Sequence, residues 1–308
     1  MSVAVNADFE GIRRWIYRNA RPLDLARWKY HCESGSPEAV VEALSAYQNQ
    51  DGGFGHALEA DSWNPASTPI QTTTAIEKLL EIHFEDKLHP LVQGILKYLD
   101  SGADVVEGRW LNTVLSNNDY PHAPWWHTDS DSTARSEYNP SAIIAGFILK
   151  FADRSTPLYA RGLEVAQELA ERFMSNSVLE MHPLKCFVTL LELIPQAGLQ
   201  NEFPYSELQE AAVRQAGMLI VRDAQNWEGY GCRPSAFVHS PASPFYTGNE
   251  ILLEQELEYL SSSKNEAGVW NITWSWAAYE KQFAISENWW KAEVAINNVR
   301  LLRAFGRI

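Results

Sequence analysis

The chain has 308 residues, 45% of them hydrophobic and 21% charged, which allows a full buried core and excludes an intrinsically disordered protein. Its formal net charge is −14, with lysines and arginines scattered along the chain, so the composition argues against a nucleic-acid-binding protein. The three cysteines are too few and too widely spaced for a disulfide framework.

Apolar residues recur with helical spacing through most of the chain, and no segment shows the alternation that is typical of a β-strand. In chain order, this spacing predicts helices over residues 9–18, 37–47, 70–83, 90–100, 140–152, 157–174, 183–194, 205–222, 245–261 and 289–304. The sequence therefore predicts an all-α protein.

The first residues lack the basic start and apolar stretch of a secretory signal. The longest apolar runs are also too short to span a bilayer. We therefore expect a cytoplasmic protein with no transmembrane segment.

Several of the expected helices begin alike, with a small, polar or histidine residue followed by proline. Proline suits the first helical turn because it lacks an N–H that would be unpaired there. The four pairs are Thr68-Pro69, Asn139-Pro140, His182-Pro183 and Ser243-Pro244. Helices 140–152 and 183–194 are apolar almost all round, so we expect an inner layer of such helices, with amphipathic helices such as 157–174 outside it.

A second pattern precedes these helices: a turn in which glycine stands near an aromatic residue. It recurs at Gly53-Phe54, Gly108-Arg109-Trp110, Gly229-Tyr230 and Gly268-Val269-Trp270. Outer helix, turn, loop and inner helix thus form a repeating unit, and an array of such units can close into a ring. We expect one domain over residues 1–308.

The first turn, Tyr47-Gln48-Asn49-Gln50-Asp51-Gly52-Gly53-Phe54-Gly55, resembles the Q-x-x-D-G-G-F-G core of the prenyltransferase and squalene-cyclase repeat. The segments Ser67-Thr68-Pro69 and Thr72-Thr73-Thr74-Ala75 resemble the start of an inner helix in that family. The resemblance implies an α/α toroid of the terpenoid-cyclase and protein-prenyltransferase superfamily, with inner and outer helices around a central cavity. It also implies that Gln48 and Asp51 hydrogen-bond the turn backbone.

The segment Asp129-Ser130-Asp131-Ser132-Thr133-Ala134 is similar to the D-x-D-D-T-A motif of class II cyclases, with serine in place of the last aspartate. The resemblance implies that Asp131 is a general acid that protonates an alkene, with His122 or His127 as its hydrogen-bonding partner. A Ser- and Asp-rich exposed loop is the alternative interpretation, because such residues favour loops.

The sequence predicts no metal ion and no cofactor. The D-D-x-x-D motif for magnesium is absent, and Cys232 and His239 lack the aspartate and third ligand of a zinc site.

Two loops that lead into expected inner helices, residues 55–64 and 121–127, carry the other candidates. Carboxylate pairs can perform acid–base chemistry, and aromatic side chains can hold sugars or apolar chains. With Asp131, the candidate catalytic residues are His56, Glu59 and Asp61. The candidate substrate-binding residues are Trp63, Asn64, His122, Trp125, Trp126, His127, Tyr138 and Asn139.

Three functions remain open at this point. The first is an enzyme that binds an isoprenoid or similar apolar small molecule in a central aromatic and acidic cavity. The second is a carbohydrate-active barrel that uses Glu59, Asp61 and the Trp125-Trp126 pair. The third is a non-catalytic binding or scaffold protein that kept the ring. The sequence indicates no nucleic-acid partner, and it does not give the oligomeric state.

Overall fold

The computed structural model describes residues 3–129, 137–175 and 178–308. These residues form helices joined by long loops, together with one two-stranded hairpin, so the prediction of an all-α protein is confirmed. The chain divides into two compact units, Met1–Ala43 with Ala216–Ile308, and Leu44–Gln215. We call them the terminal unit and the central unit.

The described part of the central unit contains five complete helices and several short elements. Its helices are α4 (Pro69–Glu81), α5 (Pro90–Asp100), α6 (Ser141–Phe151), α7 (Pro157–Met174) and α8 (Met181–Gln196) with most of α9 (Tyr205–Leu219). Its short elements are β1 (Val105–Val106), β2 (Arg109–Trp110) and the 3₁₀ turns η1 (Leu115–Asp119), η2 (Pro124–Trp126) and η3 (Gln200–Glu202).

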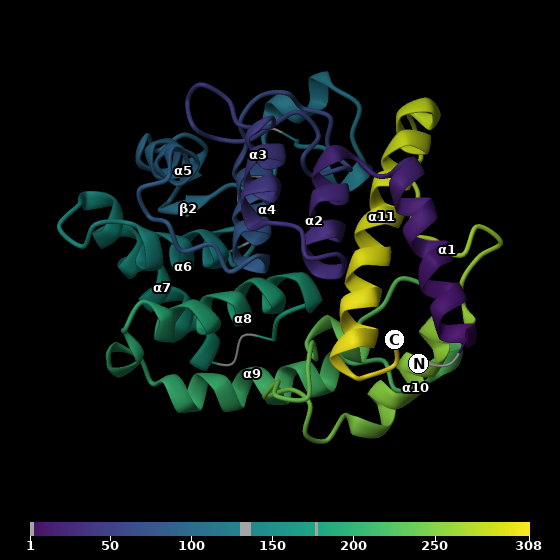
Figure 1. Cartoon of the computed structure of the whole chain (residues 1–308). Helices are drawn as coiled ribbons and strands as arrows, with labels where there is room; N and C mark the ends of the chain where they lie inside the picture. Colours follow the sequence, from purple (N-terminus) through teal and green to yellow (C-terminus); the bar gives the residue numbers. More distant parts are fainter. Residues whose placement is uncertain (1–2, 130–136, 176–177) are drawn as a thin grey trace. The chain divides into compact units, whose positions relative to one another are not determined.

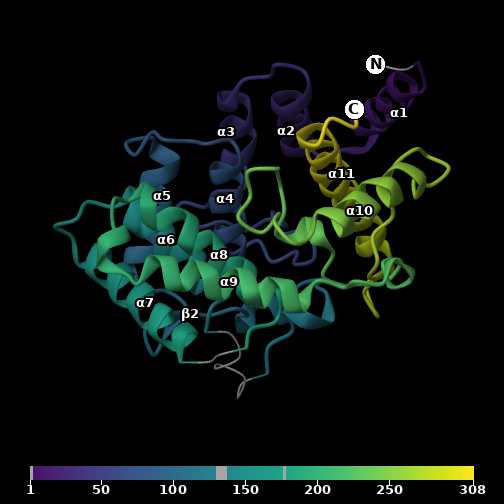
Figure 2. The same ribbon diagram turned by 90° about the horizontal axis from the view of Figure 1, so that it is seen from below.

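The core of the central unit is centred on α6, in which all eleven residues are buried. Helices α7 and α8 pack against α6, and α4 contacts it as well (Figure 1, Figure 2). The nearly continuous apolar sequence of α6 is what such a buried position requires. The expected burial of this helix is therefore confirmed.

The β1–β2 hairpin is a departure from helix that the sequence analysis did not predict. Its turn residues Glu107 and Gly108 both have positive φ angles, 48° and 76°, as a two-residue hairpin turn requires. Trp110 after the turn is fully buried, and its backbone N–H donates to Ser141 Oγ at 3.1 Å. The predicted glycine–aromatic turn thus fastens the hairpin to the first residue of α6.

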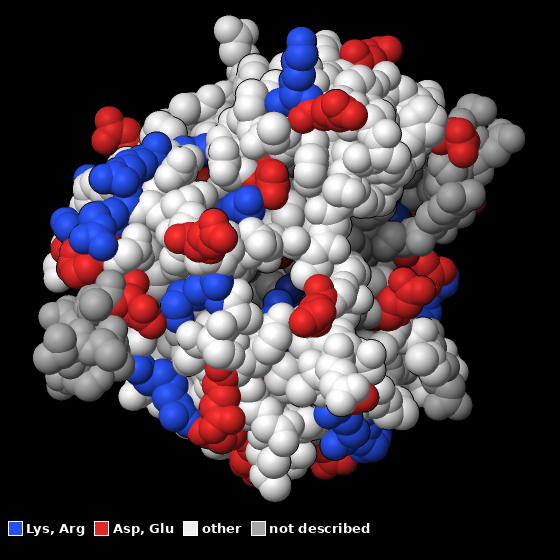
Figure 3. All heavy atoms as spheres, turned by 90° about the vertical axis from the view of Figure 1, so that its right-hand side faces the viewer, with Lys and Arg blue, Asp and Glu red and all other residues white. Residues whose placement is uncertain are grey.

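The terminal unit contains helices from both ends of the chain. They are α1 (Val3–Asn19), α2 (Pro22–Cys32), most of α3 (Pro37–Ser45), α10 (Glu250–Ser262) and α11 (Glu280–Ala304), with the 3₁₀ turns η4 (Ala224–Asn226) and η5 (Pro234–Ala236). Helices α1 and α2 both pack against α11 (Figure 1). The turn η5 packs against α10. Lys and Arg lie among Asp and Glu on the face drawn in Figure 3.

Helix α2 was not predicted, because its buried face carries charged residues. Asp24 and Arg27 are fully buried beside Leu23 and Trp28. The Arg27 guanidinium donates to Asp24 Oδ1 at 3.2 Å and to Glu293 Oε1 of α11 at 3.0 Å. A search for helical periodicity treats charged residues as solvent-facing. It therefore does not detect a buried helix face whose charged residues form ion pairs.

The four X-Pro pairs have different positions in the structure. The predicted helix start at Thr68-Pro69 is confirmed, and Thr68 caps α4, with Oγ1 accepting from Gln71 N–H at 3.2 Å. The peptide bond before Pro140 is cis, and Pro183 lies in the first turn of α8. The pair at Ser243 precedes α10, which begins at Glu250, by a run of turns, so the prediction of a helix start there was wrong. Proline also begins α2, α3, α5 and α7, so it marks helix starts in general rather than inner helices.

None of the helices in the described residues is both long enough and apolar enough to cross a membrane.

Candidate functional site

The turn at residues 49–54 joins the loop before α4 to helix α5. Gln48 Nε2 donates to Gly52 O at 2.9 Å and to Leu91 O in α5 at 3.0 Å. Gly52 has a φ of +97°, and a Cβ atom on it would lie 2.0 Å from Gly94 O. Only glycine fits there, because the positive φ and the α5 backbone both exclude a side chain.

Asp51 and Asn49 fasten the following loop to this turn. Asp51 Oδ1 accepts from Gly53 N–H at 2.9 Å and from Ser67 Oγ at 2.6 Å. Asn49 Nδ2 donates to Pro65 O at 3.0 Å. The expected bonds from Gln48 and Asp51 to turn backbone are present.

A second copy of this turn lies in the terminal unit, at residues 265–270. Asn49 N–H donates to Gly53 O at 2.8 Å, and Asn265 N–H donates to Val269 O at the same distance. The glycine N–H in each turn donates back to the asparagine carbonyl, both at 2.9 Å. Gly268 also has a positive φ, +82°. The aromatic residue that follows, Phe54 or Trp270, is buried in each case. The same backbone turn therefore follows a helix in both units.

The two loops that the sequence analysis singled out lie side by side in the central unit. Trp63 N–H donates to Pro121 O at 2.9 Å, and Ala123 N–H donates to Asp61 O at 2.8 Å. Between these bonds, Ser62 and His122 form an antiparallel bridge. We call residues 55–64 and 115–129 the loop pair.

Buried amides hold the loop pair together. Asn64 is fully buried, and its Nδ2 donates to Ser116 Oγ at 2.8 Å and to Asn117 Oδ1 at 3.0 Å. Asn117 Nδ2 donates to Trp126 O at 3.2 Å. Gln71 Nε2 of α4 donates to Asn64 O at 2.8 Å. Asn64 thus positions the loops, and its predicted contact with substrate stays a prediction.

The candidate carboxylates belong to the interior of the first loop. Glu59 and Asp61 are buried, and Glu59 Oε2 accepts the N–H of Asp61 at 3.0 Å. His56 is exposed with a φ of 60°, and its Nε2 lies 2.9 Å from Asn49 Oδ1 in the motif turn. The catalytic roles predicted for these three residues stay predictions. The Glu59 carboxylate stabilises the loop, because it accepts a backbone N–H within it.

The second loop contains a pair of stacked histidines. The rings of His122 and His127 lie 5.4 Å apart with an interplanar angle of 15°, and His122 Nε2 lies 3.2 Å from His127 Nδ1. His122 Nδ1 lies 2.6 Å from Tyr120 O, which can only accept, so this nitrogen carries a hydrogen. A neutral His122 then accepts from His127 Nδ1, and His127 Nε2 faces Asp129 Oδ1 at 3.7 Å. His122 is buried and His127 is exposed, so the pair connects the loop interior with solvent.

Tryptophans surround the histidine pair in sequence. Trp125 is 45% exposed, whereas Trp63 and Trp126 are half-buried. An exposed indole offers a flat apolar face on which a ligand can stack. The loop pair therefore combines an aromatic surface with two imidazoles.

Three buried polar atoms of the loop pair have no hydrogen-bond partner among the described residues: Ser62 Oγ, Trp126 Nε1 and Thr128 Oγ1. Buried polar groups are normally paired, so a set of unpaired ones indicates bound water or a polar ligand. Sequence analysis missed Ser62 and Thr128, because serine and threonine are unremarkable in loops. The side chain of Ser62 shares a face with that of its bridge partner His122.

Two sequence-predicted residues, Tyr138 and Asn139, are not brought into the loop pair, and a third cannot be placed. Asp131 lies outside the described residues. Tyr138 is buried in the helical core, where its hydroxyl donates to Leu169 O at 3.3 Å and its ring meets Phe187 edge-on at 5.6 Å. Asn139 precedes the cis proline at the start of α6.

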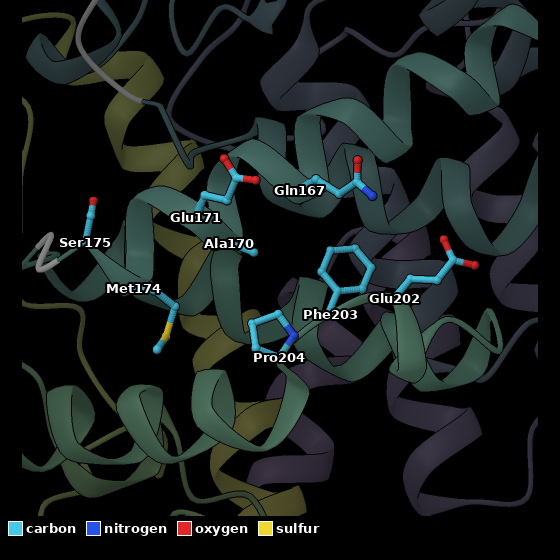
Figure 4. A pocket seen from close by; sticks show the side chains of 8 residues that line it. All are labelled: Gln167, Ala170, Glu171, Met174, Ser175, Glu202, Phe203 and Pro204. Carbon is cyan, nitrogen blue, oxygen red and sulfur yellow. The ribbon is translucent and has the colours of Figure 1, made fainter.

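The central unit also has an open surface groove of about 590 Å³. Residues of α7 and of η3, with those that directly follow each, line it, among them Met174, Phe203 and two glutamates, Glu171 and Glu202 (Figure 4). None of the sequence-predicted site residues that the structure describes lines this groove. Its mixed, open lining carries no defined catalytic chemistry.

Comparison of the chain with family models, with curated proteins and with solved structures gave no match. The described residues contain no group of three or more His, Cys, Asp or Glu side chains that is arranged to hold a metal ion.

Proposed function

We propose that the chain has an α/α toroid fold of the terpenoid-cyclase and protein-prenyltransferase kind. The turn that recurs at Asn49 and Asn265 supports this proposal, because it has the same backbone hydrogen bonds in both units. The contacts of α6 with α4 and α8 further support an inner helix layer. Recurrence of one supersecondary unit is the signature of a closed or open helical array.

The proposed function is that of a cytoplasmic enzyme that binds an apolar small molecule of the isoprenoid class and acts on it by acid–base chemistry. The observation that carries this proposal is the contact between His122 and His127 in a loop that also exposes Trp125. The indole face would pack on the hydrocarbon, and the exposed imidazole of His127 would give or take a proton. His122 would orient His127, because Tyr120 O fixes its tautomer.

The first test is calorimetric titration of the whole protein with an isoprenoid alcohol such as farnesol, followed by a search for converted product by mass spectrometry. We expect binding that weakens at least ten-fold in Trp125→Ala. The matched control is Leu88→Ala, which removes another exposed apolar side chain of the central unit, 83% exposed, and should leave binding unchanged. Equal binding by Trp125→Ala and the wild type would rule out the loop pair as the site.

Product formation separates an enzyme from a binding protein. His127→Ala and Asp131→Asn should each abolish conversion if the two side chains act as acids or bases. Binding without any product in the wild type would instead favour the non-catalytic alternative.

A second candidate is binding of a polyol such as a sugar. The unpaired Ser62 Oγ, Trp126 Nε1 and Thr128 Oγ1 favour it, because hydroxyl groups of a ligand would satisfy them. Titration with mono- and oligosaccharides tests this candidate. Loss of sugar binding in a Ser62→Ala, Thr128→Val double variant would support it, and absence of sugar binding in the wild type would reject it.

A further inference from the structure

The surface groove of the central unit follows one face of α7 (Figure 4). Four residues of α7 line it at spacings of one, three and four residues: Gln167, Ala170, Glu171 and Met174. Such residues share one face of a helix, so the groove follows α7 for about two turns, or roughly 10 Å. The turn η3 and the residues directly after it form the facing side.

Apolar side chains line the groove on both sides. Ala170 and Phe203 line it although they are otherwise buried, and Met174 is 41% exposed. A surface helix normally presents polar residues to solvent, so an exposed methionine beside buried apolar residues is unusual. The flexible, polarisable methionine side chain adapts to the shape of a partner and is common at surfaces that bind peptides. The groove therefore offers a partner an apolar strip along α7.

Two carboxylates of the groove have no partner among the described residues. Glu171 and Glu202, one from each side, form no ion pair and no side-chain hydrogen bond there. Glu168 of the same helix is paired instead, because its Oε1 accepts from Arg172 Nη2 at 2.8 Å. The described residues that line the groove include no lysine or arginine. The groove is therefore complementary in charge to a cationic partner.

The open form of the groove favours a protein segment over a small molecule. A small-molecule pocket encloses most of the surface of its ligand, whereas this groove of about 590 Å³ is open to solvent. A helix of a partner that lies along α7 would cover the apolar strip. The net charge of −14 disfavours a second copy of this chain as the partner and favours a basic segment.

We propose that the groove between α7 and η3 binds a basic amphipathic helix of a partner protein. Apolar side chains of that helix pack on Met174 and Phe203, and its lysines or arginines lie beside Glu171 and Glu202. A groove of this kind holds a helix through apolar side chains at helical spacing. The groove contains none of the loop-pair residues, so this proposal does not depend on the proposed function.

The test is titration of the whole protein with a synthetic amphipathic peptide of leucine and lysine, about 12 residues long, which as a helix spans about 18 Å. The chain has 4 methionines, so NMR of labelled methionine methyl groups gives few signals, which substitution assigns. We expect the peptide to shift the Met174 signal and to leave that of Met218 in α9, which is 71% exposed, unchanged. No shift of Met174 in a large excess of peptide would overturn the proposal.

Two altered peptides separate docking in the groove from general attraction to an acidic protein. Glutamate in place of every lysine reverses the charge, and serine in place of every leucine removes the apolar face. Each should bind at least about ten-fold more weakly than the parent peptide, because both the charge and the apolar face contribute. Equal binding of the lysine–serine peptide would show that net charge alone attracts the peptide, which would contradict the proposal.

Paired variants locate the charges that the peptide uses. Glu171→Gln combined with Glu202→Gln should weaken binding of the parent peptide about five-fold or more, because two ion pairs are lost. Both side chains are exposed, so these substitutions should not disturb folding. The matched control is Glu107→Gln combined with Glu258→Gln, which removes two exposed carboxylates outside the groove and should change binding by less than about two-fold. Equal losses in the two double variants would place the peptide elsewhere and contradict the proposal.

Discussion

His122 Nε2 and His127 Nδ1 lie 3.2 Å apart, and this contact joins a buried imidazole to an exposed one across five residues of the chain. The two residues have different surroundings. His122 is covered by the backbone-paired first loop, whereas His127 faces solvent. Their substitutions should therefore have different consequences.

We predict that His122→Ala destabilises the protein and that His127→Ala does not. The His122 variant loses the bond to Tyr120 O and buried packing, which should lower the free energy of unfolding by about 1–3 kcal/mol. The His127 variant should change it by less than about 0.5 kcal/mol, as is usual for exposed sites. Urea unfolding followed by circular dichroism measures both values. Similar losses in the two variants would contradict the assigned burial.

The two related turns provide a matched pair of glycines. Gly52→Ala would place Cβ 2.0 Å from Gly94 O in α5, so we expect a loss of more than about 3 kcal/mol from backbone displacement. Gly268→Ala meets nothing within 4 Å, so only its positive φ opposes it, at about 1–2 kcal/mol. The difference in unfolding midpoints tests whether the turn of the central unit is clamped by α5 and that of the terminal unit is free of such a contact.

The ion network of α2 and α11 should dominate the local stability of the terminal unit. Arg27→Met removes the guanidinium that bridges Asp24 and the partly buried Glu293, and it leaves Asp24 with its second partner Arg21, so we expect a cost of about 3 kcal/mol, the low end for a broken buried pair. The control is Arg214→Ala, which removes an exposed pair with Glu210 and should change stability by less than about 0.5 kcal/mol. If Arg27→Met unfolds like the control, the network has no such role.

Glu256 should make stability depend on pH. Burial raises the pKa of this carboxyl, while bonds from Ser235 and the nearby Arg233 oppose the rise. The folded state then holds the proton of Glu256 more tightly than the unfolded state does. The stabilisation that Glu256 gives the folded state is therefore fully present below the ordinary glutamate pKa of about 4.3, and it is lost as pH rises through the folded pKa.

The measurement is the difference in unfolding free energy between the wild type and Glu256→Gln as a function of pH. We expect the wild type to lose stability relative to the variant as pH rises from about 4.3 through that window. A difference that stays constant with pH would show that the pKa of Glu256 is the same in the folded and unfolded states.

Much of the helical architecture could be predicted from the sequence, because its signals are local. The buried helix 140–152 is α6, and the roles of Gln48 and Asp51 follow from turn chemistry. Helix α2 could not be predicted, since its buried face is charged. The pairing of residues 61–63 with 121–123 is a long-range contact that no local pattern encodes. The unpaired hydroxyls of Ser62 and Thr128 could not be predicted either, because only the structure shows that these side-chain oxygens are buried.

The most direct test of the proposed function is hydrogen exchange of the whole protein, followed by mass spectrometry, with and without farnesol. We expect slower exchange of backbone amides in residues 55–64 and 115–129, including Trp63 and Ala123, and unchanged exchange in α10. Protection confined to other segments, or none at saturating farnesol, would contradict the assignment of the loop pair as the ligand site.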